Sequence, residues 1–334
     1  MSPDFYTIQS TNSKKIILKS FKALNIIKRT NPSIELKFHI KQFKPDLIFI
    51  PNERYLYFKN IPTIIMVRNM EPLVKISGNP IKELIVNKLK RLIALNSCKK
   101  SNHIIAVSDY VRETLINKMN IEERKISRVY HGGTEALNDD KLKKIDFGVK
   151  NFLFTAGSIR PARGLEDIII ALGILKRKQS KIPHLVIAGE CINMGLYKKK
   201  LNRLIEKYKI EENIVWLGKI NQEKMGWCYK NSIATILSSR VESFCYVAHE
   251  AMSYGSIIIS SNSKCLPEIL GNAAIYYESL NPTDLSHMIE KILINPTIRS
   301  NNVQAFSRAR EFSSIRNFQE IMEVFKKVYS QNHT

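Results

Sequence analysis

Two glutamates eight positions apart, Glu242 and Glu250, lie in the stretch VESFCYVAHEAMSYG at 241–255. The β-branched run IATIL at 233–237 comes before them, and the stretch changes from polar residues to good helix formers. We therefore expect Glu242 in a strand-to-helix loop and Glu250 inside the helix. A carboxylate on the flank of such a helix can accept hydrogen bonds from a vicinal diol such as that of a ribose. By spacing alone, a solvated helix face is the favoured interpretation.

The start of this predicted helix is a candidate anion site. Ser243 is a candidate N-cap residue, and the amides of Phe244, Cys245 and Tyr246 come close to the helix N-terminus. Unpaired N–H groups and the helix dipole favour a phosphate or carboxylate there.

A second strand-to-helix loop carries arginines. The run FLFTAG at 152–157 is followed by SIRPARG and the helical pattern LEDIIIAL, which gathers Gly157, Ser158, Arg160, Arg163 and Gly164 in one loop. Arginine forks bind phosphate oxygens in a bidentate manner. On this loop alone, a phosphate site and a solvated loop with incidental arginines both stay open.

Several other kinds of site have no motif in this sequence. It contains no DxD, no HExxH and no Cys/His cluster, so we expect no dedicated metal site. It also contains no GxSxG and no GxxxxGK[ST]. The seven histidines are isolated, and each is interpreted as structural or as a surface residue. The five cysteines are scattered and never spaced as CxxC, which predicts reduced thiols in a cytosolic protein.

Short β-branched runs alternate with helical patterns along most of the chain. The runs are 46–50, 63–67, 103–107 and 126–130 in the first half, then 152–157, 184–189, 213–218, 233–237, 256–260 and 273–277. Helical patterns include 165–178, 194–209 and 247–255. Nearly continuous apolar strands that alternate with helices predict βαβ units and parallel sheets, and hence the α/β class.

A polar segment at 131–150 with three glycines predicts a linker between two such sheets. We therefore predict a first domain at 1–145 and a second at 146–315. The last residues, 316–334, belong to a helical pattern that begins at 303 and can reach back over the first domain. A ligand would bind in the cleft between the domains, at the carboxyl ends of the strands.

Composition describes a soluble globular protein with a strong positive charge. Hydrophobic residues make up 44% and charged residues 25%, and no apolar run is long enough to span a membrane. The first ten residues show no secretion signal. The net charge is +22, and 11–30 holds six basic residues and no acid. Such a field attracts phosphates, although an AT-rich genome is an equal explanation of the bulk charge. No basic motif with interleaved aromatic residues appears, so nucleic acid is not an expected partner.

Ordered blocks in the second half resemble those of the group 1, or family 4, glycosyltransferases. The blocks are AGSIRPARGLEDIIIAL, HLVIAGE, NIVWLGKI and VESFCYVAHEAMSYGSIIISSNSKCLPEILGNAAIYY, and the last has the E-x7-E spacing of that family. The resemblance covers 150–295, with a weaker match in HIIAVSDYVRETL. It implies a GT-B fold, in which two Rossmann-like, doubly wound domains face a cleft. It also implies a retaining, metal-independent transfer of a sugar from a nucleotide diphosphate sugar to a glycan or lipid-linked acceptor.

The resemblance assigns roles to the conspicuous residues. Arg163 matches the residue that neutralises the donor diphosphate, Glu242 the glutamate that faces the sugar, and Glu250 the glutamate that binds the ribose. Arg163 and Glu242 are therefore the predicted catalytic residues, and Ser243 and Tyr246 belong to the same donor-binding loop.

Other matches are less regular. Phe244 and Cys245 match a Phe-Gly pair whose amides approach the donor, with cysteine in place of the usual glycine. Ile220 matches a position whose backbone contacts the base. Ser158 stands where many members have a second arginine, for which Arg160 can compensate.

The first half departs from the family pattern. The family usually opens with a strand and a Gly-rich loop, whereas the first glycine here is Gly78. Either the start of the protein lies upstream or that loop is lost or remodelled. A histidine common after an early strand is replaced by Arg68 in IIMVRNMEP, so Arg68 and Asn69 are candidate contacts to the donor or the acceptor. These departures leave a second hypothesis, a catalytically impaired GT-B protein that binds nucleotides or a partner.

A helical pattern at 81–100 alternates Ile and Leu with lysines. Such a helix can lie on an anionic membrane that carries the acceptor. Packing of an ordinary amphipathic helix on the first sheet is the favoured alternative. We thus expect a cytoplasmic protein, with peripheral attachment to the inner face of the membrane as an open alternative. The sequence leaves a UDP-, GDP- or ADP-sugar equally open as the donor.

Overall fold

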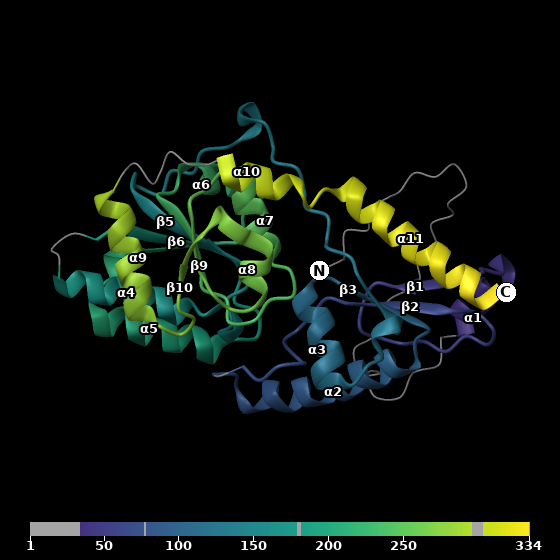
Figure 1. The fold of residues 1–334 in the computed structure, drawn as a ribbon. Helices are drawn as coiled ribbons and strands as arrows, with labels where there is room; N and C mark the ends of the chain where they lie inside the picture. The colour runs from purple at the N-terminus through teal and green to yellow at the C-terminus, as the bar shows by residue number, and fades with distance from the viewer. Residues whose placement is uncertain (1–33, 77, 179–181, 296–302, 334) are drawn as a thin grey trace.

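The computed structural model describes residues 34–76, 78–178, 182–295 and 303–333, and the basic stretch at 11–30 lies outside them. Two α/β units are visible, each built on a parallel sheet (Figure 1). The first sheet has the order β1-β2-β3-β4, and the second has the order β10-β9-β8-β5-β6-β7. The predicted α/β fold class is therefore confirmed.

The first sheet consists of short, apolar strands. Its members are β1 (Ile48–Ile50), β2 (Thr63–Val67), β3 (His103–Ala106) and β4 (Ile126–Arg128). Every residue of β2 and β3 is buried, as expected of central parallel strands covered on both faces. The accompanying helices are α1 (Ile34–Phe43), α2 (Ile81–Lys100) and α3 (Asp109–Met119). The helix predicted at 81–100 is thus confirmed.

The second sheet is larger and reverses its strand order in the middle. Its strands are β5 (Phe152–Ala156), β6 (His184–Ala188), β7 (Ile214–Gly218), β8 (Ala234–Leu237), β9 (Ile258–Ser261) and β10 (Ile275–Tyr277). Its helices are α4 (Leu165–Lys178), α5 (Gly195–Tyr208), α6 (Gln222–Asn231), α7 (Tyr246–Ser253), α8 (Cys265–Leu270) and α9 (Pro282–Ile294). Because β5 lies between β6 and β8, the loops after β5 and β8 leave the same edge side by side. A reversal of this kind is where parallel α/β sheets bind ligands.

The C-terminal tail forms two helices, α10 (Val303–Arg310) and α11 (Ser314–His333). The prediction of one helical pattern through 303–329 is therefore wrong at 311–313. Phe312 is buried at the break, and its carbonyl oxygen accepts a hydrogen bond of 2.7 Å from the amide of Gly133. This contact joins the two segments that cross between the units, which explains why the helix is interrupted there.

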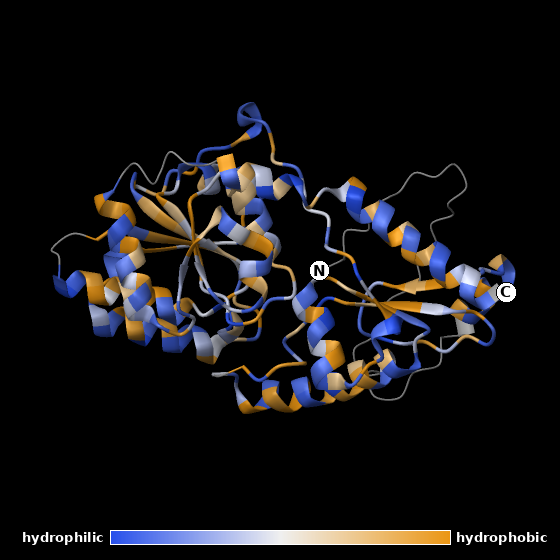
Figure 2. Ribbon diagram, viewed as in Figure 1, coloured by the Kyte–Doolittle hydropathy of each residue, from blue (hydrophilic) through white to orange (hydrophobic). Residues whose placement is uncertain are grey.

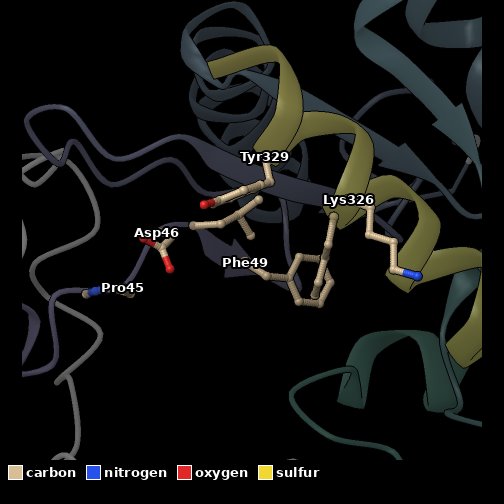
Figure 3. A pocket seen from close by; sticks show the side chains of 7 residues that line it. Pro45, Asp46, Phe49, Lys326 and Tyr329 are labelled. Atoms are coloured by element: carbon tan, nitrogen blue, oxygen red, sulfur yellow. The ribbon is translucent and has the colours of Figure 1, made fainter. Parts of the chain in front are cut away.

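Helix α11 packs along the first sheet, not the second (Figure 1). The rings of Phe49 and Phe325 lie 5.2 Å apart, and Val324 and Val328 are buried. Figure 3 shows Lys326 and Tyr329 of α11 beside Asp46 and Phe49, around a cavity of about 520 Å³. The last helix thus completes the core of the first unit.

The second unit also supplies a cap to the first. The carboxylate of Glu268, on α8, accepts hydrogen bonds of 2.6 and 2.9 Å from the amides of Asp109 and Tyr110 at the start of α3. Capping of free helix N–H groups by a carboxylate is favourable, so this contact stabilises the arrangement of the two units.

Among the described helices, none combines the length and apolar character that a bilayer crossing requires.

Candidate functional site

The loops that follow β5 and β8 are joined through their backbones. The amide of Arg240 donates to the carbonyl of Ala162 at 2.9 Å, and the hydroxyl of Ser238 donates to the carbonyl of Arg163 at 2.7 Å. Gly164 has a φ of +62°, and a Cβ there would lie 2.2 Å from the carbonyl oxygen of Ser238. Only glycine fits this close approach, so the Arg163 loop is fixed against the loop that carries Glu242.

Arg163 and Glu242 form an ion pair at this edge of the sheet. The Nη1 group of Arg163 donates to Oε1 of Glu242 and, at 3.3 Å, to Oγ of Ser239. Glu242 is nearly buried, with 10% of its side chain exposed. Its charge is the main reason that the pKa of Arg163 is raised above its ordinary value, so the guanidinium stays charged.

Helix α7 begins in a way that the sequence does not predict. Cys245 holds the N-cap position with φ 71° and ψ 81°, the left-handed conformation that glycine adopts most readily. Here a buried cysteine adopts it, and burial raises the pKa of its thiol well above the ordinary value. The thiol therefore stays neutral beside Arg163 and Glu242.

The prediction that Ser243 caps this helix is wrong. Because the N-cap position falls at Cys245, Ser243 lies outside it, and within the described part of the chain no side chain caps α7. The Ser243 hydroxyl instead donates a hydrogen bond of 2.6 Å to the carbonyl of Arg68 in the first unit.

Glu250 lies on α7 and is partly buried. The hydroxyl of Tyr229 donates to its Oε2 at 2.7 Å, and burial raises the pKa of the Glu250 carboxyl. Tyr229 is itself buried and stacks on Tyr254, with ring centroids 5.9 Å apart. Neither Glu242 nor Glu250 is therefore on a solvated helix face, the interpretation that spacing alone favours.

Glycines line the strand ends beside the Arg163 loop. The amide of Gly157 donates to the carbonyl of Ala188 at 2.9 Å, and Gly157 has a φ of +122°. A Cβ on the neighbouring Gly189 would lie 1.8 Å from the carbonyl oxygen of Gly157. Ser158 is exposed, and Ile220 is half-buried after β7. Both belong to this edge but are outside the cavity described next.

A cavity of about 300 Å³ lies between the two units and contains most of the predicted site. The second unit contributes Arg163 and residues 241–247, and the first contributes Arg68, Asn69, Met70, Glu71 and His131. The amides of Arg68 and Asn69 both donate to a carboxylate oxygen of Glu53 at 2.6 Å, which fixes this loop after β2.

Three residues are missed by sequence reasoning: Glu71 and His131, which line this cavity, and Glu53, which holds the Arg68–Asn69 loop. The His131 ring lies 5.1 Å from that of Tyr246, and burial, together with the charge of Arg68, lowers the pKa of His131 to about 4. Its isolated position in sequence gives no sign of this. Glu71 does have a signal, because it lies only two residues after Asn69 in the RNMEP segment.

Arg160 contacts the first unit. Its Nη2 group lies 3.0 Å from Oε2 of Glu71 and 3.5 Å from Oε1 of Glu83. Its predicted role in donor binding stays a prediction.

The cavity therefore combines guanidinium groups, carboxylates and a neutral imidazole. Guanidinium groups suit the oxygens of a diphosphate, and carboxylates suit hydroxyl groups. In the described ranges, no group of three or more His, Cys, Asp and Glu side chains could hold a metal ion.

Two family models match the chain. The model described as "Glycosyl transferases group 1" matches residues 138–310, and the model described as "Glycosyltransferase Family 4" matches residues 14–133. The first of these alone covers more than half of the chain.

Curated relatives carry related names. An uncharacterized glycosyltransferase, MJ1607, of Methanocaldococcus jannaschii is 27% identical over 221 residues, which are 62% of this chain and 54% of the relative. The O-antigen chain mannosyltransferase RfbU of Salmonella typhimurium is 23% identical over 194 residues, 58% of this chain and 51% of the relative. The chain thus spans about half the length of the curated relatives it matches.

Solved structures share the fold. Anabaena Alr3699/HepE, in complex with UDP and glucose, has a TM-score of 0.72 at 17% identity and covers 87% of this chain and 80% of its own. A glycosyltransferase from Rickettsia africae has a TM-score of 0.69 at 17% identity, with coverages of 94% and 84%.

Proposed function

This chain belongs to the group 1, family 4 glycosyltransferases, and from that premise we propose that it is a retaining, metal-independent enzyme. Its donor is a nucleotide diphosphate sugar, and its acceptor is a glycan or a lipid-linked glycan. The observation that carries the proposal is the Arg163–Glu242 ion pair, which lies where the strand order reverses and lines the cleft between the two units.

The charge of Arg163 suits the departing diphosphate. When the bond between the sugar and the diphosphate breaks, negative charge grows on the leaving oxygen, and a fixed guanidinium stabilises it. Residues at the start of α7 line the same cavity, and the amides of a helix N-terminus add partial positive charge. Together they supply the charge that a metal ion supplies in other transferases.

Glu242 suits the opposite change at the sugar. Positive charge develops on the sugar ring as the bond breaks, and a nearby carboxylate stabilises it. The ion pair with Arg163 offsets the cost of placing this carboxylate in a nearly buried position. Retention of configuration rests on the family resemblance.

Glu250 is the proposed ribose ligand. One of its oxygens accepts from Tyr229, which leaves the other free to accept from the ribose diol. Burial strengthens such hydrogen bonds, because less water competes for the carboxylate.

Helix α2 supports attachment to an anionic membrane. Five of its large apolar side chains point outward: Ile81, Leu84, Ile85, Leu89 and Leu92 are between 42% and 77% exposed. Its buried residues are small or polar, namely Asn87, Ala94, Ser97 and Cys98. Exposed Lys82, Lys88, Lys90 and Arg91 accompany the apolar stripe, and Figure 2 shows both colours along the helix. An apolar stripe flanked by cations is typical of a helix in a membrane interface.

A donor screen followed by a transfer assay tests the main proposal. The full chain is heated with UDP-, GDP- and ADP-sugars, and the best donor at a hundred times its Kd should stabilise the fold by about 2.7 kcal/mol. That donor is then assayed with lipid-linked glycan acceptors. Arg163→Met should lose the donor shift, whereas exposed Arg203→Met should keep it. A chain that no donor stabilises, and that forms no glycosylated product, contradicts the proposal.

A second candidate is a nucleotide-binding protein with impaired catalysis. It is favoured by Arg68, which replaces the histidine common in the family and lines the same cavity. This candidate predicts a donor-induced shift without a glycosylated product, so the same two assays separate it from the enzyme.

A further inference from the structure

Five charged residues alternate in sign across the cleft between the two units. They are, in spatial order, Glu83, Arg160, Glu71, Arg163 and Glu242. Glu83 lies in the first turn of α2, and Glu71 follows the Arg68–Asn69 loop, so both carboxylates around Arg160 belong to the first unit. Arg160 itself belongs to the donor-side loop of the second unit.

We propose that Arg160 is a positioning residue that holds the first unit against the donor site through Glu71 and Glu83. This proposal rests on the proposed transferase function and names what assembles its active site. We call these three residues the Arg160 cluster.

Geometry favours this role over direct donor binding. One nitrogen of Arg160, Nη2, lies 3.0 Å from Glu71 and 3.5 Å from Glu83. The three side chains are only 18–29% exposed, so the pairing is partly shielded from water and salt. A donor phosphate would have to displace both carboxylates to take this nitrogen.

Glu71 links the cluster to the reacting groups. It lines the same cavity as Arg163 and Glu242. Burial raises the pKa of Glu71, while the charges of Arg160 and Arg163 oppose that rise. The Arg68–Glu71 loop is held a second time from the other unit, by the hydrogen bond of 2.6 Å from Ser243 to the Arg68 carbonyl.

Helix α2, which carries Glu83 of the cluster, lies on the opposite side of the molecule from the segments that cross between the units. Those crossings are tied together by the Gly133–Phe312 bond of 2.7 Å and by a bond of 2.9 Å from Ser314 Oγ to the Gly133 carbonyl. Figure 1 shows the crossings along the upper side of the molecule and α2 along the lower side. A contact on the side opposite the crossings limits the width of the cleft more than a contact beside them, so its loss should open the cleft.

Kinetics separate a positioning role from a donor ligand. Glu83 has no place at the donor, so Glu83→Gln should lower kcat/KM for the acceptor about fivefold and change donor Kd less than twofold. Arg160→Met should do the same, and the double variant should lose little more because both changes break one contact. Glu113→Gln and Arg203→Met, which replace exposed charges, are the matched controls. If Glu83→Gln matches wild type while Arg160→Met weakens donor binding tenfold, Arg160 is a donor ligand and the proposal is wrong.

A second measurement needs no activity. Small-angle X-ray scattering of the full chain should show a larger radius of gyration for Arg160→Met and Glu83→Gln than for wild type and both controls. High salt should expand wild type toward the variants. Equal radii for all proteins overturn the positioning role. If the variants have larger radii but the wild-type chain transfers no sugar, only the proposed function is contradicted.

Discussion

Arg163 donates a hydrogen bond to the carboxylate of Glu242, although the two residues are 79 positions apart in the chain. The reversal of strand order between β5 and β8 brings them together. The site therefore holds opposite charges in contact before any ligand binds. In the proposed function, a donor diphosphate would share the guanidinium with Glu242, and this would keep the carboxylate beside the sugar that the diphosphate carries.

Loss of either partner of this pair should slow transfer strongly. We expect Arg163→Met or Glu242→Gln to lower kcat by about 10²- to 10³-fold, because each removes a charge aimed at the transition state. Arg163→Met also leaves Glu242 nearly buried without its cation, which should cost about 1–3 kcal/mol of unfolding free energy. Transfer assays and urea denaturation measure the two effects, with Arg203→Met as the control. Near-normal turnover in both variants would remove these residues from the mechanism.

Tyr229→Phe should weaken donor binding through Glu250. The variant loses the hydrogen bond of 2.7 Å that lowers the pKa of the Glu250 carboxyl against the effect of burial. The folded-state pKa should therefore rise further, and donor affinity should be lost at a higher pH than in wild type. Donor Kd measured by calorimetry from pH 5 to 8 tests this, while kcat should change little. A lower affinity with an unchanged pH profile would point to a packing effect instead.

Glycine at position 245 should suit the backbone better than alanine. Cys245 has a φ of 71°, where a Cβ costs about 1 kcal/mol, and only glycine removes it. Cys245→Gly should therefore be about 1 kcal/mol more stable than Cys245→Ala, and Cys245→Val should be the least stable because of its β-branch. Chemical denaturation of the three variants gives the order. An alanine variant more stable than the glycine variant would contradict this account.

The exposed stripe of α2 should bind anionic vesicles. We expect Ile85→Ser/Leu89→Ser to reduce co-sedimentation with phosphatidylglycerol vesicles at least tenfold, since each apolar side chain contributes about 1.5 kcal/mol or more when buried. Stability should change by less than about 0.5 kcal/mol, because both side chains are exposed. Ile294→Ser, an exposed apolar residue of the second unit, is the matched control. Equal binding to anionic and uncharged vesicles would argue against this surface.

Acid should destabilise the fold through His131. Its pKa is lowered by burial and by Arg68 to about 4, below the value near 6.5 of an unfolded histidine. Between these values the unfolded chain binds more protons, so stability falls as pH decreases from 6.5 to 4. His131→Gln should remove roughly 3 kcal/mol of this loss, and His103, whose pKa is lowered in the same way, accounts for a similar part. Urea denaturation across this range measures the slope, and exposed His287→Gln should leave it unchanged.

The sequence predicts local structure well where one pattern decides it. The bounds of β2, α2 and α4 agree with the predicted ranges, because a continuous apolar run decides the strand and apolar periodicity decides the two helices. Ser243 does not cap α7, because the helix starts at Cys245, which holds the N-cap position in a left-handed conformation. Cysteine is not among the residues preferred at an N-cap, so the sequence does not reveal this start. The break at Phe312 depends on a contact with Gly133, which no local pattern reveals.

Contacts between the units are the part that sequence reasoning misses. The pairing of Arg160 with Glu71 and Glu83, and the capping of α3 by Glu268, depend on how the two units sit together. Taken one at a time, these arginine and glutamate residues are of the types that usually lie on the solvent-exposed surface. Periodicity predicts that α2 has an apolar stripe. It does not predict whether that stripe packs on the sheet or faces outward.

The packing of α11 on the first sheet has a consequence for biosynthesis. Phe49 and its strand leave the ribosome early, but Phe325, which covers that strand, is made only after the whole second sheet. Part of the core of the first unit is therefore exposed to solvent while the second unit is translated. Folding of the nascent chain is expected to require a chaperone during that interval, and chains stalled before residue 314 should be open to proteases.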